Sequence, residues 1–103
     1  MDRKFTLSYL PLFEQDMAAA RDYIAYNLRN PAAALRLVED TEKAILKRLL
    51  NPLGFEPYHS SRDRQYPYYR IHVRNYTVFY VVIDDVMEVR RFVYGRRDLP
   101  GTV

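Results

Sequence analysis

Residues 68–98, YYRIHVRNYTVFYVVIDDVMEVRRFVYGRRD, contain most of the predicted sheet. Three runs of β-branched and aromatic residues are broken at Asn75 and at Asp84-Asp85. Runs of this kind between turn residues predict an antiparallel meander of three strands. In the first run, residues 70–74 alternate polar with apolar side chains, which predicts one buried face and one solvent-facing side. The middle run, residues 76–83, is apolar almost throughout, so we place it at the centre of the sheet.

The residues before the meander predict one more strand and two helices. Residues 4–9 (KFTLSY) alternate polar with apolar side chains, which is typical of a half-buried strand. Residues 11–29 carry apolar side chains every three or four positions, as an amphipathic helix does. Asn30-Pro31 begins a second helix that ends before Asn51. The two apolar stripes are Phe13, Met17, Ala20, Ile24 and Leu28, then Ala34, Val38, Thr41, Ile45 and Leu49.

The resulting order, β-α-α-β-β-β, predicts an α+β fold. The helical hairpin should pack on one face of a small, mainly antiparallel sheet. A chain of 103 residues is long enough for a single core, so we expect one domain over residues 1–103. The chain has no cysteine, no apolar run that could cross a bilayer and no signal-peptide pattern. We therefore expect a cytoplasmic protein that does not enter a membrane.

The positive charge is concentrated in the second half of the chain. Residues 60–103 contain eight arginines, no lysine and five acids, whereas the charges of residues 1–59 balance. Seven of the ten tyrosines lie between Tyr58 and Tyr94. Guanidinium groups match phosphate geometry and tyrosine rings stack on bases, which favours nucleic-acid binding. The alternative is that the tyrosines reflect the general preference of β-strands for tyrosine, and that the arginines solubilise the solvent-exposed face of the sheet.

Familiar catalytic and cofactor motifs are absent from the sequence. It has no phosphate loop and no dinucleotide fingerprint. His59 and His72 stand thirteen residues apart without a second ligand nearby, so we expect no metal and no cofactor. A serine triad built on Ser60 or Ser61 has no supporting motif.

Four side chains are candidates for chemistry on a phosphodiester. Arg70, Tyr94 and one of the later arginines on a concave face would hold the phosphate and stabilise developing charge. In RNA cleavage the 2′-hydroxyl is the nucleophile, so the protein needs a base, an acid and cations. Glu56 is the candidate base, and Tyr94 or an arginine is the candidate acid.

Three of the candidates, Arg91, Arg70 and Glu56, also have a purely structural interpretation. Strict alternation along the last strand separates Arg91 from Tyr94 unless a β-bulge intervenes. In the structural interpretation, Arg91 is a half-buried arginine that pairs with an acid from a helix. Arg70 is otherwise a solvated strand arginine, and Glu56 an ordinary loop residue.

Three motifs together resemble the RelE/ParE superfamily of type II toxin–antitoxin toxins. Residues 69–80, YRIHVRNYTVFY, are similar to the family's Tyr-Arg…Tyr segment, and residues 89–98, VRRFVYGRRD, to its closing V-x-R-V-x-H-x-R-R-D pattern. Residues 30–34, NPAAA, resemble the opening of the family's second helix. The three motifs occur in the family's order and span nearly the whole chain.

The resemblance implies roles for individual residues. Arg70 matches the phosphate-binding strand arginine of the ribonuclease members, and Tyr94 stands where members have a histidine or tyrosine that acts as acid or base. Glu56 resembles the general base of the YoeB-type branch, and Arg91 belongs to the closing pattern. The lysine pair that RelE uses is missing. Arg62 and Arg64 would supply positive charge in its place. Nucleic-acid contacts are expected from Arg62, Arg64, Arg74, Arg90, Arg96 and Arg97.

The resemblance also implies that the chain is a toxin that arrests growth and that a cognate antitoxin neutralises it. The two proteins would then form a toxin–antitoxin hetero-oligomer. RelE-like and YoeB-like members cleave mRNA on the ribosome, whereas ParE-like members inhibit DNA gyrase without nuclease chemistry. From the sequence we favour a metal-independent, ribosome-dependent endoribonuclease. The alternatives are a ParE-like gyrase inhibitor and a non-catalytic module that binds RNA or protein.

Overall fold

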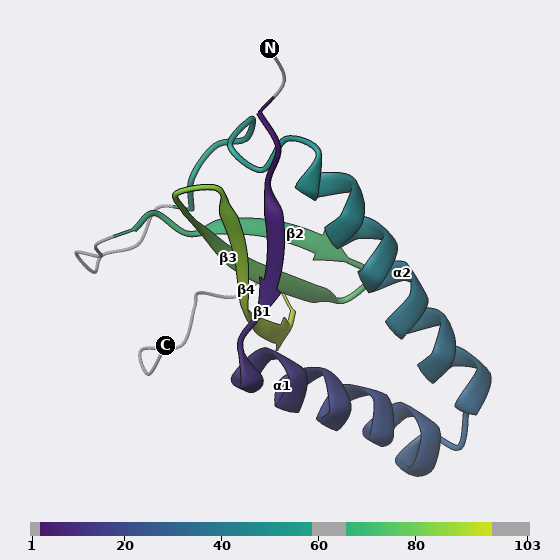
Figure 1. Cartoon of the computed structure of the whole chain (residues 1–103). Helices are drawn as coiled ribbons and strands as arrows, with labels where there is room; N and C mark the ends of the chain where they lie inside the picture. The colour runs from purple at the N-terminus through teal and green to yellow at the C-terminus, as the bar shows by residue number, and fades with distance from the viewer. Residues whose placement is uncertain (1–2, 59–65, 96–103) are drawn as a thin grey trace.

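The computed structural model describes residues 3–58 and 66–95 of the chain. Its elements are β1 (Thr6–Tyr9), α1 (Pro11–Asp22), the π-helical turn η1 (Tyr23–Asn27), α2 (Pro31–Leu49), β2 (Tyr69–Val73), β3 (Tyr76–Ile83) and β4 (Val86–Tyr94). The strand order in the sheet is β1-β4-β3-β2. β2, β3 and β4 form the predicted antiparallel meander, and β1 joins its edge parallel to β4 (Figure 1). The predicted α+β order is confirmed.

The main core lies between the helical hairpin and one face of the sheet. Phe13 of α1 and Ile45 of α2 meet Val78 and Tyr80 of β3, and all four are almost fully buried. β2 alternates as predicted, because Tyr69, Ile71 and Val73 are buried while Arg70 and His72 are exposed. The helices therefore cover one face of the sheet and leave the polar side chains of β2 on the other.

The second face of the sheet carries a smaller apolar cluster. Tyr58, Tyr68, Phe79 and Val81 are buried there, and Tyr58 and Phe79 meet edge to face with ring centroids 5.5 Å apart. β3 is consequently buried on both faces, as its unbroken apolar sequence predicts.

α2 begins at the residue predicted from its cap. The Asn30 side chain accepts a hydrogen bond from the Ala33 N–H at 3.1 Å, and Pro31 occupies the first helical position. The buried stripe, however, includes Leu37, which the predicted stripe omitted, and leaves Leu35 61% exposed.

The first helix departs from α-helical geometry in its last turn. In η1 the Leu28 N–H donates to the Tyr23 carbonyl at 3.1 Å, a bond that spans five residues instead of four. The extra residue in this turn rotates the next side chains about the helix axis. The prediction that Leu28 continues the buried stripe is therefore wrong: its side chain is 57% exposed.

A β-bulge interrupts the pairing of β4. Phe79 pairs with Arg91 and Tyr80 pairs with Val89, which leaves Arg90 as an extra residue on β4. Val89 and Phe92, three residues apart, consequently both point into the core under the helices. The bulge changes the alternation at the two arginines that were predicted to contribute to the site.

Candidate functional site

Arg70 lies on the face of the sheet that the helices do not cover. It is opposite Phe79 in the β2–β3 pairing, and its guanidinium carbon lies 4.7 Å from the centre of the Tyr58 ring. At this distance the tyrosine ring attracts the guanidinium through a cation–π interaction, which does not neutralise the positive charge. Arg70 is exposed, so its positive charge is presented to solvent beside an aromatic surface.

Tyr94 belongs to the opposite face. It pairs with Tyr76 across β3 and β4, and their rings meet at 80° with centroids 5.3 Å apart. Tyr76 in turn stacks on Phe92 of the helix-side core, with centroids 4.6 Å apart. Neighbouring positions on a strand point to opposite faces, so the three-residue interval from Tyr76 to Phe79 separates Tyr94 from Arg70. The sheet lies between the two predicted catalytic side chains.

Arg91 is bound by an acid of α1. Its Nε and Nη2 atoms donate to the two carboxylate oxygens of Asp16 at 2.6 and 3.2 Å, and both side chains are only 15% exposed. Asp16 also accepts the backbone N–H of Phe92 at 3.0 Å. Arg91 is therefore paired with an acid from a helix, as its structural interpretation stated. The pair connects α1 to the bulge in β4.

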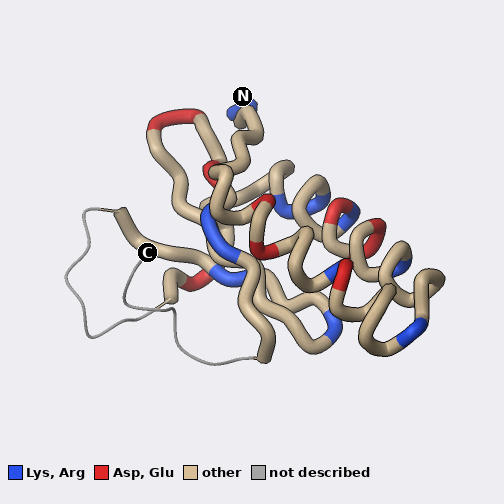
Figure 2. The backbone as a smooth tube through the Cα atoms, turned by 90° about the horizontal axis from the view of Figure 1, so that it is seen from below, with Lys and Arg blue, Asp and Glu red and all other residues tan. Residues whose placement is uncertain are grey.

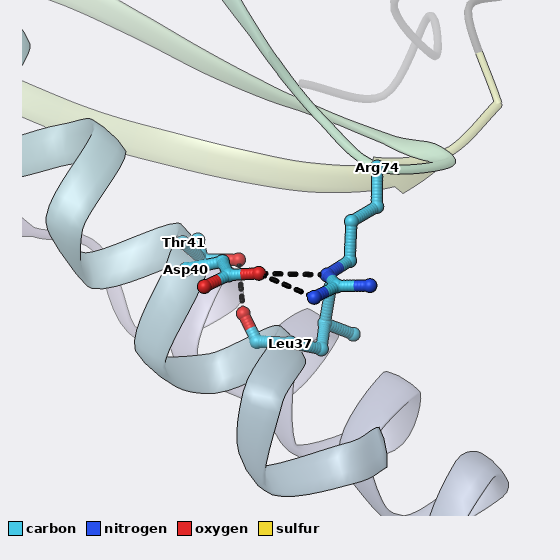
Figure 3. Close-up of polar contacts among 4 residues, drawn as sticks. All are labelled: Leu37, Asp40, Thr41 and Arg74. Carbon is cyan, nitrogen blue, oxygen red and sulfur yellow. Dashed lines mark hydrogen bonds and ion pairs between the residues drawn. The ribbon is translucent and has the colours of Figure 1, made fainter.

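Arg74 and Arg90 also form ion pairs. Arg74 donates twice to one carboxylate oxygen of Asp40 on α2, at 2.8 and 2.6 Å, from the turn after β2 (Figure 3). Arg90 donates to Glu88 at 2.8 Å and to the Tyr68 hydroxyl at 3.1 Å. Burial alone lowers the pKa of Arg90, but the bonds to Tyr68 and Glu88 outweigh it and raise that pKa above its ordinary value.

Of the remaining predicted residues, Glu56 alone lies within the described part of the chain. Glu56 is exposed in the segment between α2 and β2. Arg62, Arg64, Arg96 and Arg97 lie outside the described residues. Figure 2 shows that the Lys and Arg positions of the described residues are spread over the helices and the sheet, with Asp and Glu positions among them. The described arginines therefore form no shared anion cradle.

Arg48 is a key residue that the sequence analysis missed. From the last turn of α2 its Nη1 donates to the Tyr80 hydroxyl at 2.9 Å and to the Arg70 carbonyl at 3.2 Å. Its guanidinium carbon lies 3.5 Å from the centre of the Phe55 ring. No motif marks Arg48, and only its place on the helix beside the sheet could have indicated it. One guanidinium thus joins α2, the segment after it and two strands.

The Tyr80 hydroxyl completes this connection. It donates to the Pro52 carbonyl at 2.7 Å from a ring that has no exposed surface. Burial raises the pKa of Tyr80, and the hydrogen bond and charge of Arg48 oppose the increase. The segment that carries Glu56 is therefore anchored to β3 by a buried polar pair.

Replacing Tyr80 by phenylalanine should lower the free energy of unfolding by about 1–3 kcal/mol, because the Pro52 carbonyl would lose its donor and Arg48 its acceptor. Chemical denaturation followed by circular dichroism measures this. Tyr26→Phe is the matched control, because the Tyr26 side chain is 76% exposed. Equal stability of the two variants would show that the buried hydroxyl contributes nothing.

An open hollow of about 700 Å³ lies where α1 and η1 meet the end of the sheet. Its lining includes Tyr23, Tyr76 and Tyr94 together with Leu28 and Asp16. Asp16 is bound to Arg91, and the other residues of the lining are mainly apolar or aromatic. This surface suits contact with a protein better than binding of a polyanion.

The described residues contain neither a cluster of metal ligands nor a membrane-spanning helix. Among residues 3–58 and 66–95, no three His, Cys, Asp or Glu side chains are grouped as metal ligands would be. Over the same residues, no helix combines the length and the apolarity required to cross a membrane.

The fold and the sequence place the chain in a known family. The family model for the "ParE toxin of type II toxin-antitoxin system, parDE" matches residues 7–99. The chain belongs to the ParE toxin family. The predicted RelE/ParE resemblance is confirmed. No curated protein matches the chain at the level of sequence.

Solved structures of toxins share the fold of this ParE-family chain. The chromosomal ParDE toxin–antitoxin system of P. aeruginosa has a chain that matches with a TM-score of 0.70 and 16% identity, over 91% of this chain and 99% of that one. The E. coli DinJ–YafQ toxin–antitoxin complex matches with a TM-score of 0.55 and 12% identity, over 88% and 92% of the two chains. At such identities the likeness is one of fold alone.

Proposed function

We propose that this ParE-family toxin arrests growth by binding and inhibiting DNA gyrase, and that it does not cleave RNA. The observation that carries the proposal is the separation of Arg70 and Tyr94 by the sheet. Acid–base catalysis needs both groups within hydrogen-bond reach of one substrate. This replaces the preference for mRNA cleavage that we drew from the sequence.

The pairing of the other arginines supports the same proposal. A nuclease without a metal relies on unneutralised cations to stabilise charge on the phosphate. Arg74, Arg90 and Arg91 each hold a carboxylate instead. Paired in this way they stabilise the fold, and inhibition by protein contact needs no reacting groups.

We further propose that a cognate antitoxin neutralises the chain. The structures that share its fold include the ParDE system and the DinJ–YafQ complex, in which toxins occur with antitoxins. An antitoxin that covers apolar and tyrosine-rich surface would compete directly with a protein target. Gyrase acts in the cytoplasm, so the proposal places the toxin there as a single-domain protein.

The test is to add the purified toxin to a gyrase supercoiling reaction and, in parallel, to a cell-free translation reaction. We expect supercoiling to fall with toxin concentration and translation to continue with intact mRNA. Heat-denatured toxin is the control in both reactions. Cleaved mRNA together with normal supercoiling would establish the nuclease and refute the proposal.

A further inference from the structure

Large apolar side chains are exposed at the turn of the helical hairpin. Tyr26 is 76% exposed, Leu28 57% and Leu35 61%. A shallow hollow of about 380 Å³ lies between Tyr26 and Leu35. Figure 1 shows that this turn is the end of the hairpin farthest from the sheet. We call this surface, formed by Tyr26, Leu28, Arg29, Leu35 and Arg36, the hairpin tip.

The π-helical turn produces this exposure. It rotates Leu28 away from the stripe that buries Phe13 and Met17. The next residue, Arg29, has a φ of 52°, in the left-handed region that costs a residue with a side chain about 1 kcal/mol. The Asn30 N–H donates to the Ile24 carbonyl at 3.1 Å and fixes this conformation. Such turns are concentrated at functional sites.

The hairpin tip is also positively charged. Arg29 and Arg36 are the only charged residues between Tyr23 and Val38, and both are exposed. Within the described part of the chain, neither guanidinium takes part in an ion pair, in contrast to Arg74 and Arg91. The one acid that lines the hollow, Asp22, is paired with Arg21 at 3.0 Å, so Arg29 and Arg36 leave the tip with an excess of positive charge.

The tip has the composition of a protein-binding surface. Tyrosine and arginine are the residues that most often dominate binding energy at interfaces, and exposed apolar patches mark such surfaces. Solvated arginines beside an apolar patch favour a partner with the opposite charge. The complementary surface is a shallow apolar one bordered by carboxylates.

We propose that the hairpin tip is the surface by which the toxin holds gyrase, at an apolar, acid-bordered patch of that enzyme. This inference rests on the proposed function. It assigns target binding to the helical end of the molecule, away from Arg70 and the outer face of the sheet.

The experiment compares the Tyr26→Ala/Leu35→Ala double variant with the wild type in the supercoiling reaction. We expect the toxin concentration for half-inhibition to rise on the order of 30-fold, the loss typical of a binding hot spot. Leu46→Ala is the matched control, because Leu46 lies farther along α2 and is 54% exposed. Its half-inhibition concentration should stay within about twofold of the wild type, as for a residue outside the interface. Thermal unfolding verifies that both variants fold.

Different outcomes separate this inference from the proposed function. Wild-type toxin that fails to inhibit gyrase would refute both. A double variant that inhibits as well as the wild type would refute the inference and leave gyrase as the target. Loss of antitoxin binding with unchanged gyrase inhibition would assign the tip to the antitoxin and also refute the inference.

Discussion

Replacing Asp16 by alanine should lower the free energy of unfolding by about 3–5 kcal/mol, the range for removing one partner of a buried ion pair. The substitution would leave the guanidinium of Arg91, only 15% exposed, without a countercharge. It would also remove the acceptor of the Phe92 N–H. Urea denaturation followed by far-UV circular dichroism measures the loss.

Asp40→Ala is the matched control for this prediction. Asp40 accepts two hydrogen bonds from Arg74, but the two side chains are 40% and 50% exposed. Pairs in contact with water contribute about 0–1 kcal/mol, so Asp40→Ala should lose no more than that. Equal losses in the two variants would show that burial does not set the contribution of the Asp16 pair.

Leu37→Ala should lower the free energy of unfolding by about 2–5 kcal/mol, as expected when a buried leucine is truncated and a cavity remains. Leu37 is 2% exposed and belongs to the core between α2 and the sheet. Thermal or chemical unfolding of the purified variant measures the change.

Leu35→Ala provides the control on the same helix. Leu35 is 61% exposed, two residues from Leu37, so its truncation should change stability by no more than about 0.5 kcal/mol. A large loss at Leu35 with a small one at Leu37 would show that α2 turns a different face to the sheet. It would also remove Leu35 from the hairpin tip.

The order of elements could be predicted because local signals agreed with one another. Alternation identified β2, a continuous apolar run identified β3, and Asn30-Pro31 identified the start of α2. Each of these signals depends on neighbouring residues in the sequence. The fold class followed from their order.

The errors in the predicted core arise from one irregular turn and from side-chain packing. A periodic pattern assumes 3.6 residues per turn, and η1 departs from that value just before Leu28. The face that α2 buries depends on how the helix packs on the sheet. Leu37 is central to that face, although the predicted stripe ran beside it.

The candidate site was harder to predict than the fold, because it depends on which face each side chain occupies and on its partner. The alternative given for Arg91, a pair with a helix acid, required knowledge of a residue 75 positions away in the sequence. The separation of Arg70 from Tyr94 follows from the registers of two strand pairs. Neither partner nor register is encoded by a local motif.

Growth arrest through gyrase, without cleavage of RNA, is tested most directly by expressing the chain in a bacterium. DNA damage, DNA synthesis and mRNA integrity are followed from the first minutes of expression. We predict damaged DNA and falling DNA synthesis while full-length mRNA persists. Prompt loss of protein synthesis with mRNA cleaved in coding regions, and undamaged DNA, would contradict gyrase inhibition as the toxin's mode of action.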